Sequence, residues 1–205
     1  ADQFGQPYLK TFTIAPGQDE VAFNDRIRIP LRPFPGVMGV APATDSMLST
    51  IPPRANGGNM DNRHITAGTT VYFPVFVPGA LFSIGDTHAA QGDGEVSGTA
   101  IESPMRIVYQ VDLVRGAGGA LSEPQYETDE IYGVTAFATT LDEAARKATG
   151  YMIDYLVAEH GLARTDAYAL ASLAADLRIA EVVDVPHVLV SMHIDKSVLG
   201  TAGQM

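Results

Sequence analysis

Residues 71–114 read VYFPVFVPGALFSIGDTHAAQGDGEVSGTAIESPMRIVYQVDLV, and this stretch decides the fold class. It contains four short runs rich in β-branched and aromatic residues, bounded by glycine and proline: Val71–Val77, Leu81–Ile84, Val96–Glu102 and Met105–Val114. Such runs are typical of strands, and repeated short strands with turn residues between them are typical of a β-sandwich or barrel. The stretch therefore predicts a mainly β fold, a β-sandwich of jelly-roll kind.

The residues before this stretch carry few helix signals. Phe12–Ile14, and Val21–Ile29 in part, alternate apolar and polar side chains and are predicted as strands. Three prolines between residues 30 and 35 favour a rigid extended connection. Residues 36–53 are predicted to form a loop with short strands.

Beyond residue 138 the pattern becomes helical. Thr140 followed by Glu143 forms a capping box, apolar residues recur at helical spacing, and Gly161 closes the segment. Thr165 is predicted to cap a second helix. The apolar residues expected on one face of that helix are Ala169, Leu170, Leu173 and Leu177.

Two strands are predicted after the helices, over Ala180–Val183 and His187–Ile194. The order helix, helix, strand, strand indicates a small α+β unit packed on the sandwich. We therefore expect residues 1–138 to form the sandwich that carries the site, and residues 139–205 to form the α+β unit.

Composition narrows the class of protein. The 205 residues are 46% apolar and carry a net charge of −11, with no cluster of Lys and Arg, so nucleic acid is not an expected partner. No apolar run approaches the roughly 18 residues needed to cross a membrane. The absence of cysteine excludes disulfides, thiolate zinc sites and a cysteine nucleophile, and fits a cytoplasmic location.

The chemistry is concentrated between residues 86 and 102. Asp86 and His88 follow an apolar strand, and their i, i+2 spacing points both side chains to one face. Asp93 and Glu95 repeat this spacing in a glycine-rich loop, and Glu102 ends the next predicted strand. Carboxylates so close together repel one another unless a cation or solvent neutralises them, and carboxylate with imidazole suits zinc or another first-row metal. The pattern predicts a metal site.

Each feature also has a simpler interpretation. The Gly-Asp-Gly-Glu loop could be a turn with solvated acids, and His88 could be a hydrogen-bonded structural residue. Asp61 lies in an Asn- and Gly-rich loop, where an Asx turn is equally favoured. His64 could be an exposed surface residue. The remaining histidines are expected to be structural, at a helix end or in the last strands: His160, His187 and His193.

Other catalytic patterns are missing from the sequence. It has no G-x-S-x-G elbow, no P-loop, no G-x-G-x-x-G and no S-x-x-K spacing.

Three stretches resemble motifs of the acetamidase/formamidase family: Pro33–Pro42 (PFPGVMGVAP), Ser49–Asp61 (STIPPRANGGNMD) and Pro78–Glu95 (PGALFSIGDTHAAQGDGE). The third is the most specific. The resemblance continues through Glu102 and the helical tail, so it covers nearly the whole chain. It implies hydrolysis of a short amide such as formamide or acetamide, or opening of a small lactam, with a bound divalent metal, zinc first and calcium second.

The resemblance and the residue pattern together suggest roles for individual residues. Asp61, Asp86, His88 and Glu95 are the expected metal ligands. Glu102 is the expected general acid and base, with Glu95 second. Backbone N–H groups at Gly92 and Gly94 are expected to stabilise the oxyanion.

The resemblance also has a departure. Family members are longer at the N-terminus, where they carry a His near a Trp, and this chain has no Trp. We therefore expect a second polypeptide, made by cleavage just before Ala1, to supply the remaining part, and we expect a homo-oligomer. Two rival hypotheses are a non-catalytic sandwich module with a structural calcium, and a homologue that binds metal without turnover.

Overall fold

The structure, a computed structural model, describes residues 4–116 and 121–200. Its elements follow one another as β1 (Glu20–Ala22), β2 (Arg28–Pro30), β3 (Phe34–Gly39), β4 (Gly57–Asn59), β5 (Thr70–Tyr72), β6 (Ser83–Ala90), β7 (Ile101–Glu102), β8 (Gln125–Glu127), β9 (Ile131–Ala138), α1 (Leu141–His160), α2 (Arg164–Ala174), β10 (Ala175–Glu181), β11 (Val188–Asp195) and α3 (Lys196–Leu199). Across these described ranges, none of the helices has the length and apolar character needed to cross a membrane.

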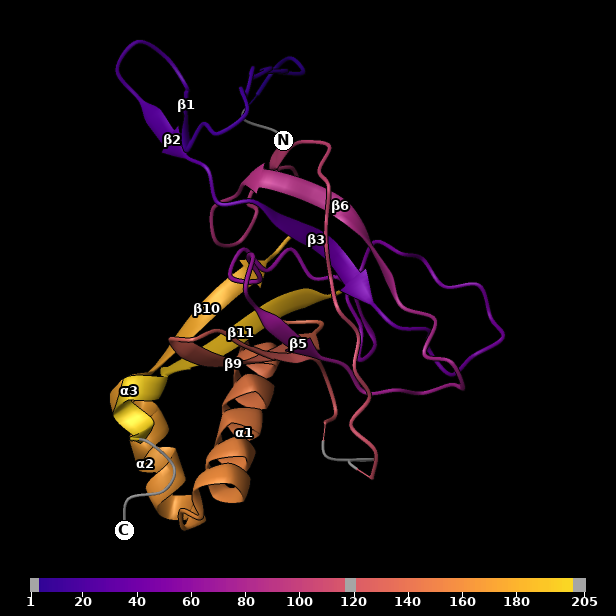
Figure 1. The fold of residues 1–205 in the computed structure, drawn as a ribbon, viewed down its shortest axis with the longest axis vertical. Helices are drawn as coiled ribbons and strands as arrows, with labels where there is room; N and C mark the ends of the chain where they lie inside the picture. Colours follow the sequence, from indigo (N-terminus) through magenta and orange to yellow (C-terminus); the bar gives the residue numbers. More distant parts are fainter. Residues whose placement is uncertain (1–3, 117–120, 201–205) are drawn as a thin grey trace.

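The strands form three antiparallel sheets (Figure 1). A five-stranded sheet has the order β10-β11-β9-β8-β5, a four-stranded sheet has the order β4-β3-β6-β7, and β1 pairs with β2. The helices lie together on one side of the five-stranded sheet, and β3 and β6 lie on its other side (Figure 1). The predicted class, mainly β with a small C-terminal helix and strand unit, is confirmed.

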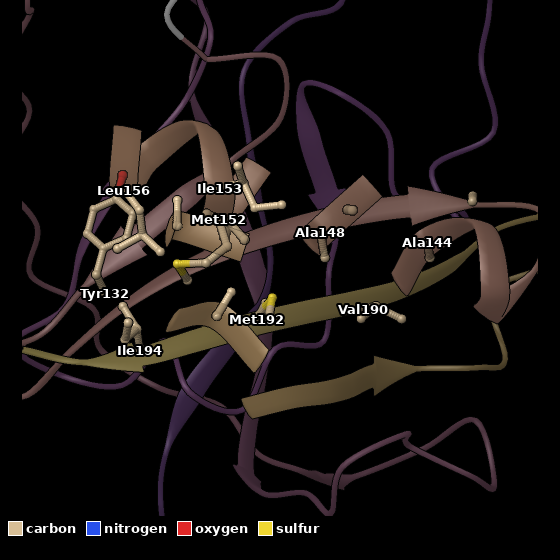
Figure 2. Packing of buried hydrophobic residues seen from close by; sticks show 14 residues of the cluster. Tyr132, Ala144, Ala148, Met152, Ile153, Leu156, Val190, Met192 and Ile194 are labelled. Carbon is tan, nitrogen blue, oxygen red and sulfur yellow. The ribbon is translucent and has the colours of Figure 1, made fainter. Parts of the chain in front are cut away.

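The main core lies between α1 and the five-stranded sheet. Helix α1 begins where the Glu143 N–H donates to the Thr140 hydroxyl, and it ends at Gly161, whose φ of 65° is left-handed. Both limits agree with the prediction. The helix residues buried at four-residue intervals are Ala144, Ala148, Met152 and Leu156. They pack on Val190, Met192 and Ile194 of β11 and on β9 (Figure 2). This spacing repeats once per helical turn, so α1 presents one continuous apolar stripe to the sheet.

Several predicted strands are shorter than expected. Instead of Val71–Val77, only Thr70–Tyr72 forms a strand, since Pro74 has no N–H to donate to a neighbour. Of Val96–Glu102, only the last two residues pair. The N–H of Gly98 donates to the carbonyl of Glu95 in a tight turn, which removes residues 95–98 from the sheet.

Two predicted strands do not form. Met105–Val114 is extended, but it pairs with no strand of the described chain and appears as a long trace in Figure 1. An alternating pattern makes a strand only where a second strand offers hydrogen bonds. Phe12–Ile14 is also outside any strand, whereas Val21–Ile29 splits into the β1–β2 hairpin. The predicted Leu81–Ile84 strand is longer, because β6 continues to Ala90.

Leu170 packs on the main core as predicted, but the rest of the apolar face predicted for the second helix does not. The second helix was predicted in the right region. It begins at Arg164, and its buried residues are Ala167 and Ala171. Leu173 is 85% exposed, and Leu177 lies in β10. The chain turns directly from α2 into β10, so the helix ends before the predicted stripe is complete. The strand therefore starts five residues before its predicted beginning at Ala180.

Candidate metal centre

His88 lies at the centre of the candidate site. Its backbone belongs to β6, with Phe34 of β3 as its partner on one side and Glu102 of β7 on the other. The side chain is buried, and its ring meets the Phe34 ring edge-on at a centroid distance of 5.1 Å. Strands on both sides and an aromatic neighbour hold the imidazole in one place.

Carboxylates surround both nitrogens of this imidazole. Nε2 lies 3.5 Å from Oδ1 of Asp86 and 3.2 Å from Oε2 of Glu102, and Nδ1 lies 3.8 Å from Oδ1 of Asp61. Ligand atoms of Asp86, His88 and Glu102 lie within 4.8 Å of one another, as do those of Asp61, His88 and Glu95. The four acids singled out in the sequence as ligands or general acid and base therefore meet around the imidazole of the fifth residue, His88.

Three of these acids have an unusual backbone. Asp61, Asp86 and Glu95 have φ values of 42°, 50° and 42°, which lie in the left-handed region that side chains other than glycine seldom adopt. Such strain gathers at functional sites, where surrounding contacts hold a side chain in a required direction. Here each of the three strained residues places a carboxylate in the group around His88.

Some buried polar atoms of the site have no hydrogen-bond partner. They include Oδ1 of Asp61 and Nε2 of His88. A buried polar atom without a partner loses its hydration and gains nothing in return, which costs about 1–3 kcal/mol. One imidazole nitrogen and several carboxylate oxygens are a donor set that divalent cations accept. The residues therefore fit a bound cation.

A second layer of acids was missed by the sequence analysis. Glu181 is buried at the end of β10, and its Oε2 accepts hydrogen bonds from the N–H groups of Val183 and Asp184. Asp184 in turn accepts a 2.8 Å hydrogen bond from the Asn59 amide. The available signal was the pair of acids that flanks Val182 and Val183 inside an otherwise apolar run.

Burial raises the pKa of several acids in and around the site. It raises the pKa of Asp61, and the charges of Glu95 and Asp184 raise it further. Burial likewise raises the pKa of Glu95 and of Asp184, and it raises the pKa of Glu181 to about 7. Because a ligating carboxylate must be deprotonated, cation binding at these groups would displace protons.

Asp93 does not join Glu95, despite their i, i+2 spacing. Its carboxylate lies 3.4 Å from Nε2 of His64 and 3.7 Å from a guanidinium nitrogen of Arg178. The turn at Gly94 and Glu95 breaks the strand geometry that would have kept the two acids on one face. His64 is half-buried, not an exposed surface residue, and with Arg178 it borders a cleft of about 490 Å³.

The two glycines proposed to stabilise the oxyanion differ in their backbone hydrogen bonds. The N–H of Gly94 donates to the carbonyl of Ala180, and its own carbonyl accepts from Val182, so it ties the loop to β10. Because the Gly94 N–H already donates to Ala180, it is not free to stabilise an oxyanion, contrary to the prediction. The carbonyl of Gly92 accepts from the Glu95 N–H, and the N–H of Gly92 stays a candidate.

The other histidines have the structural surroundings that the sequence predicted. His160 is the last residue of α1. Nδ1 of His187 lies 2.7 Å from the carbonyl oxygen of Pro53, and His193 is hydrogen-bonded to Tyr126 in the core.

Residues 43–200 match the sequence model of a family described as the Acetamidase/Formamidase family. The chain belongs to this family. The match includes His88 and the four acids around it, and it covers the second and third motifs but not Pro33–Pro42. The likeness to the family is confirmed over most of the chain.

Curated relatives carry names that agree with the family. An acetamidase from Mycolicibacterium smegmatis is 45% identical over 87 residues, which are 42% of this chain and 19% of that protein. A formamidase from Methylophilus methylotrophus is 45% identical over 67 residues, which are 32% of this chain and 16% of that protein.

Solved structures show the same fold. An acetamidase from Bacillus halodurans aligns with a TM-score of 0.79 and 31% identity, over 94% of this chain and 63% of that one. A predicted acetamidase/formamidase from Thermoanaerobacter tengcongensis aligns with a TM-score of 0.77 and 32% identity, over 88% of this chain and 59% of that one. The chain thus spans less than two thirds of these solved relatives.

Proposed function

We propose that the chain is the larger part of a metal-dependent amidase. It hydrolyses a short amide such as formamide or acetamide to a carboxylic acid and ammonia, or opens a small lactam. The observation that carries the proposal is the buried imidazole of His88, whose unpartnered Nε2 faces the carboxylates of Asp86 and Glu102. Membership of the family and the names of the relatives support the reaction class.

The proposed cation is held by His88, Asp61, Asp86 and Glu95. Zinc is favoured over calcium, because zinc takes an imidazole nitrogen as a ligand and calcium prefers oxygen alone. When bound, such a cation polarises a carbonyl and lowers the pKa of water. The alternative, a structural calcium in a non-catalytic module, requires a closed shell of oxygen ligands.

The proposed proton carrier is Glu102. Half of its side chain is exposed, so substrate and water can reach its carboxylate. Glu102 takes a proton from the attacking water while the water oxygen bonds to the amide carbon. It returns that proton to the nitrogen as the C–N bond breaks, and the amine leaves as ammonia. Glu95 is the second choice, and the N–H of Gly92 is the candidate donor to the carbonyl oxygen.

We also propose that the two parts of the chain have different roles. Residues 1–138 carry the site, and residues 139–205 support it. The support comes from the end of β10 and the residue after it, where Ala180 and Val182 are hydrogen-bonded to Gly94 in the loop that carries Glu95. Asp184 adds a contact to Asn59, at the end of β4 and two residues before Asp61.

A second polypeptide is proposed to complete the fold. The extended segment of residues 104–114 has strand-like alternation without a paired strand among the described residues. Its exposed apolar residues are Val108, Tyr109, Val111, Leu113 and Val114. Open strand edges of this kind bind further strands. The solved relatives are longer than this chain, and the proposed partner is the part of the family fold that this chain does not cover.

Native mass spectrometry of the purified protein tests this partner and the proposed homo-oligomer together. We expect masses above 21.7 kDa that resolve, after denaturation, into this chain and a second, smaller chain. Native material made of this chain alone would contradict the proposal of a second polypeptide. A native mass that corresponds to a single copy of each chain would contradict the proposed homo-oligomer. Cell fractionation tests the proposed cytoplasmic location.

The activity test measures ammonia from formamide and acetamide, and ring opening of a small lactam, by the native protein. Each is measured before chelation, after chelation and after zinc is returned. Turnover that chelation abolishes and zinc restores is the expected result. Full cation occupancy without turnover on any substrate would favour the calcium-bound module or the inactive homologue.

A further inference from the structure

Gln91 connects the two halves of the site. Its side-chain oxygen Oε1 lies 2.8 Å from Nδ1 of His88. Its side-chain nitrogen Nε2 donates to the backbone carbonyl of Asp61 at 2.6 Å and approaches the carbonyl of Ala180 at 3.5 Å. One amide therefore touches β6, the loop that carries Asp61, and the end of β10.

The two carbonyl oxygens determine how this amide is oriented. A backbone carbonyl can only accept a hydrogen bond, so the NH₂ group of Gln91 must face Asp61 and Ala180. The amide oxygen then has to face His88. An oxygen at this position can only accept, so Nδ1 of His88 must carry the proton and donate it.

The proton on Nδ1 determines the state of the other nitrogen. In a neutral imidazole with a protonated Nδ1, Nε2 has a free lone pair. This is the buried nitrogen without a hydrogen-bond partner, 3.2 Å from Glu102 and 3.5 Å from Asp86. A lone pair there repels the carboxylates in the absence of a cation and binds a cation when one is present.

We infer that Gln91 is a positioning residue, which holds His88 as the tautomer protonated on Nδ1 so that Nε2 is the nitrogen offered to a cation. Partners of this kind fix the ring orientation of ligating histidines, and their loss lowers metal affinity by about 10- to 100-fold. The cation part of this inference rests on the proposed function. The tautomer part rests on the hydrogen bonds alone.

The first test is a long-range ¹H–¹⁵N correlation spectrum of the native protein after chelation, with the His88 signals assigned by their loss in His88→Gln. We expect protonated Nδ1 and unprotonated Nε2 in the wild type. A wild-type spectrum with the proton on Nε2 would overturn the inference without any variant of Gln91.

Two variants separate the contacts of Gln91. Gln91→Met removes both hydrogen bonds, and we expect a mixture of tautomers and a zinc dissociation constant about 10- to 100-fold higher. Gln91→Glu keeps the acceptor and should keep the tautomer. Gln18→Met is the matched control, because Gln18 is an exposed glutamine outside the site whose side-chain oxygen accepts a hydrogen bond from the Ala15 N–H. It should change neither the tautomer nor the zinc affinity.

The outcomes distinguish this inference from the proposed function. Unchanged zinc affinity and an unchanged tautomer in Gln91→Met would overturn the positioning role. A tautomer that depends on Gln91 in a protein that binds no zinc would support the positioning role and defeat the proposed cation. Zinc binding without amide turnover would leave the inference intact and count against the amidase.

Discussion

Gly36 and Asp61 approach so closely that a β-carbon on Gly36 would lie 2.4 Å from Oδ1 of Asp61 and 2.8 Å from Cε1 of His88. Both groups are buried, so neither can swing away into solvent. We expect Gly36→Ala to lower the free energy of unfolding by about 1–3 kcal/mol, as overpacking does, and to weaken zinc binding. Urea denaturation and zinc titration measure the two effects.

Gly85→Ala is the matched control. It lies in β6 opposite Val37, and nothing is within 4 Å of its β-carbon position. Its effect on unfolding should stay within about 0.5 kcal/mol. Equal losses in the two variants would show that alanine destabilises both positions for another reason and that the approach of Gly36 to Asp61 is not the cause.

Gly150 is a weak point of α1. It lies inside the helix, and no atom is within 4 Å of its β-carbon position. Because glycine costs conformational entropy in a helix, Gly150→Ala should raise the free energy of unfolding by about 0.5–1 kcal/mol. Gly161→Ala should lower it by about 1 kcal/mol, because φ is 65° there. Thermal unfolding of both variants checks the opposite signs.

His193 makes the folded state sensitive to acid. Burial, with the charges of His64 and Arg178, lowers its pKa from 6.5 to about 3. Between these values the unfolded chain binds the proton and the folded chain does not. The free energy of unfolding therefore falls as pH drops from 6.5 to 3, by up to about 1.4 kcal/mol per pH unit.

Denaturation curves at several pH values test this contribution. Chelated protein with His193→Asn should lose less stability than the wild type over the same window. His160→Asn, at the end of α1, should behave as the wild type does. If the free energy of unfolding changed with pH in the same way in the wild type and in His193→Asn, His193 would not be the cause of the acid sensitivity.

Glu102→Gln tests the proposed proton carrier. The amide is close to the carboxylate in size but cannot accept the proton of the attacking water, so turnover should fall by about 100-fold or more. Zinc content, measured by elemental analysis, should stay at the wild-type level. Glu159→Gln, exposed on α1, is the control for loss of one negative charge. Loss of zinc in Glu102→Gln would identify Glu102 as a ligand.

Features that depend on neighbouring residues were predictable from the sequence. Thr140 and Gly161 mark the ends of α1, because capping bonds and left-handed glycine are local chemistry. Asp86 and His88 were expected on one face because side chains alternate along a strand, and their side chains do lie 3.5 Å apart, although the φ of 50° at Asp86 departs from strand geometry. The mainly β class followed in the same way from runs of β-branched residues.

Features that depend on distant contacts were decided only by the tertiary structure. Asp93 and Glu95 have the same spacing as Asp86 and His88, yet the turn between them sends one to Arg178 and the other toward His88. Glu181 and Asp184 reach the site because β10 pairs with the loop at Gly94. Spacing in a sequence specifies direction only while the backbone stays regular. Which side chains meet is set by the packing of segments far apart in the chain.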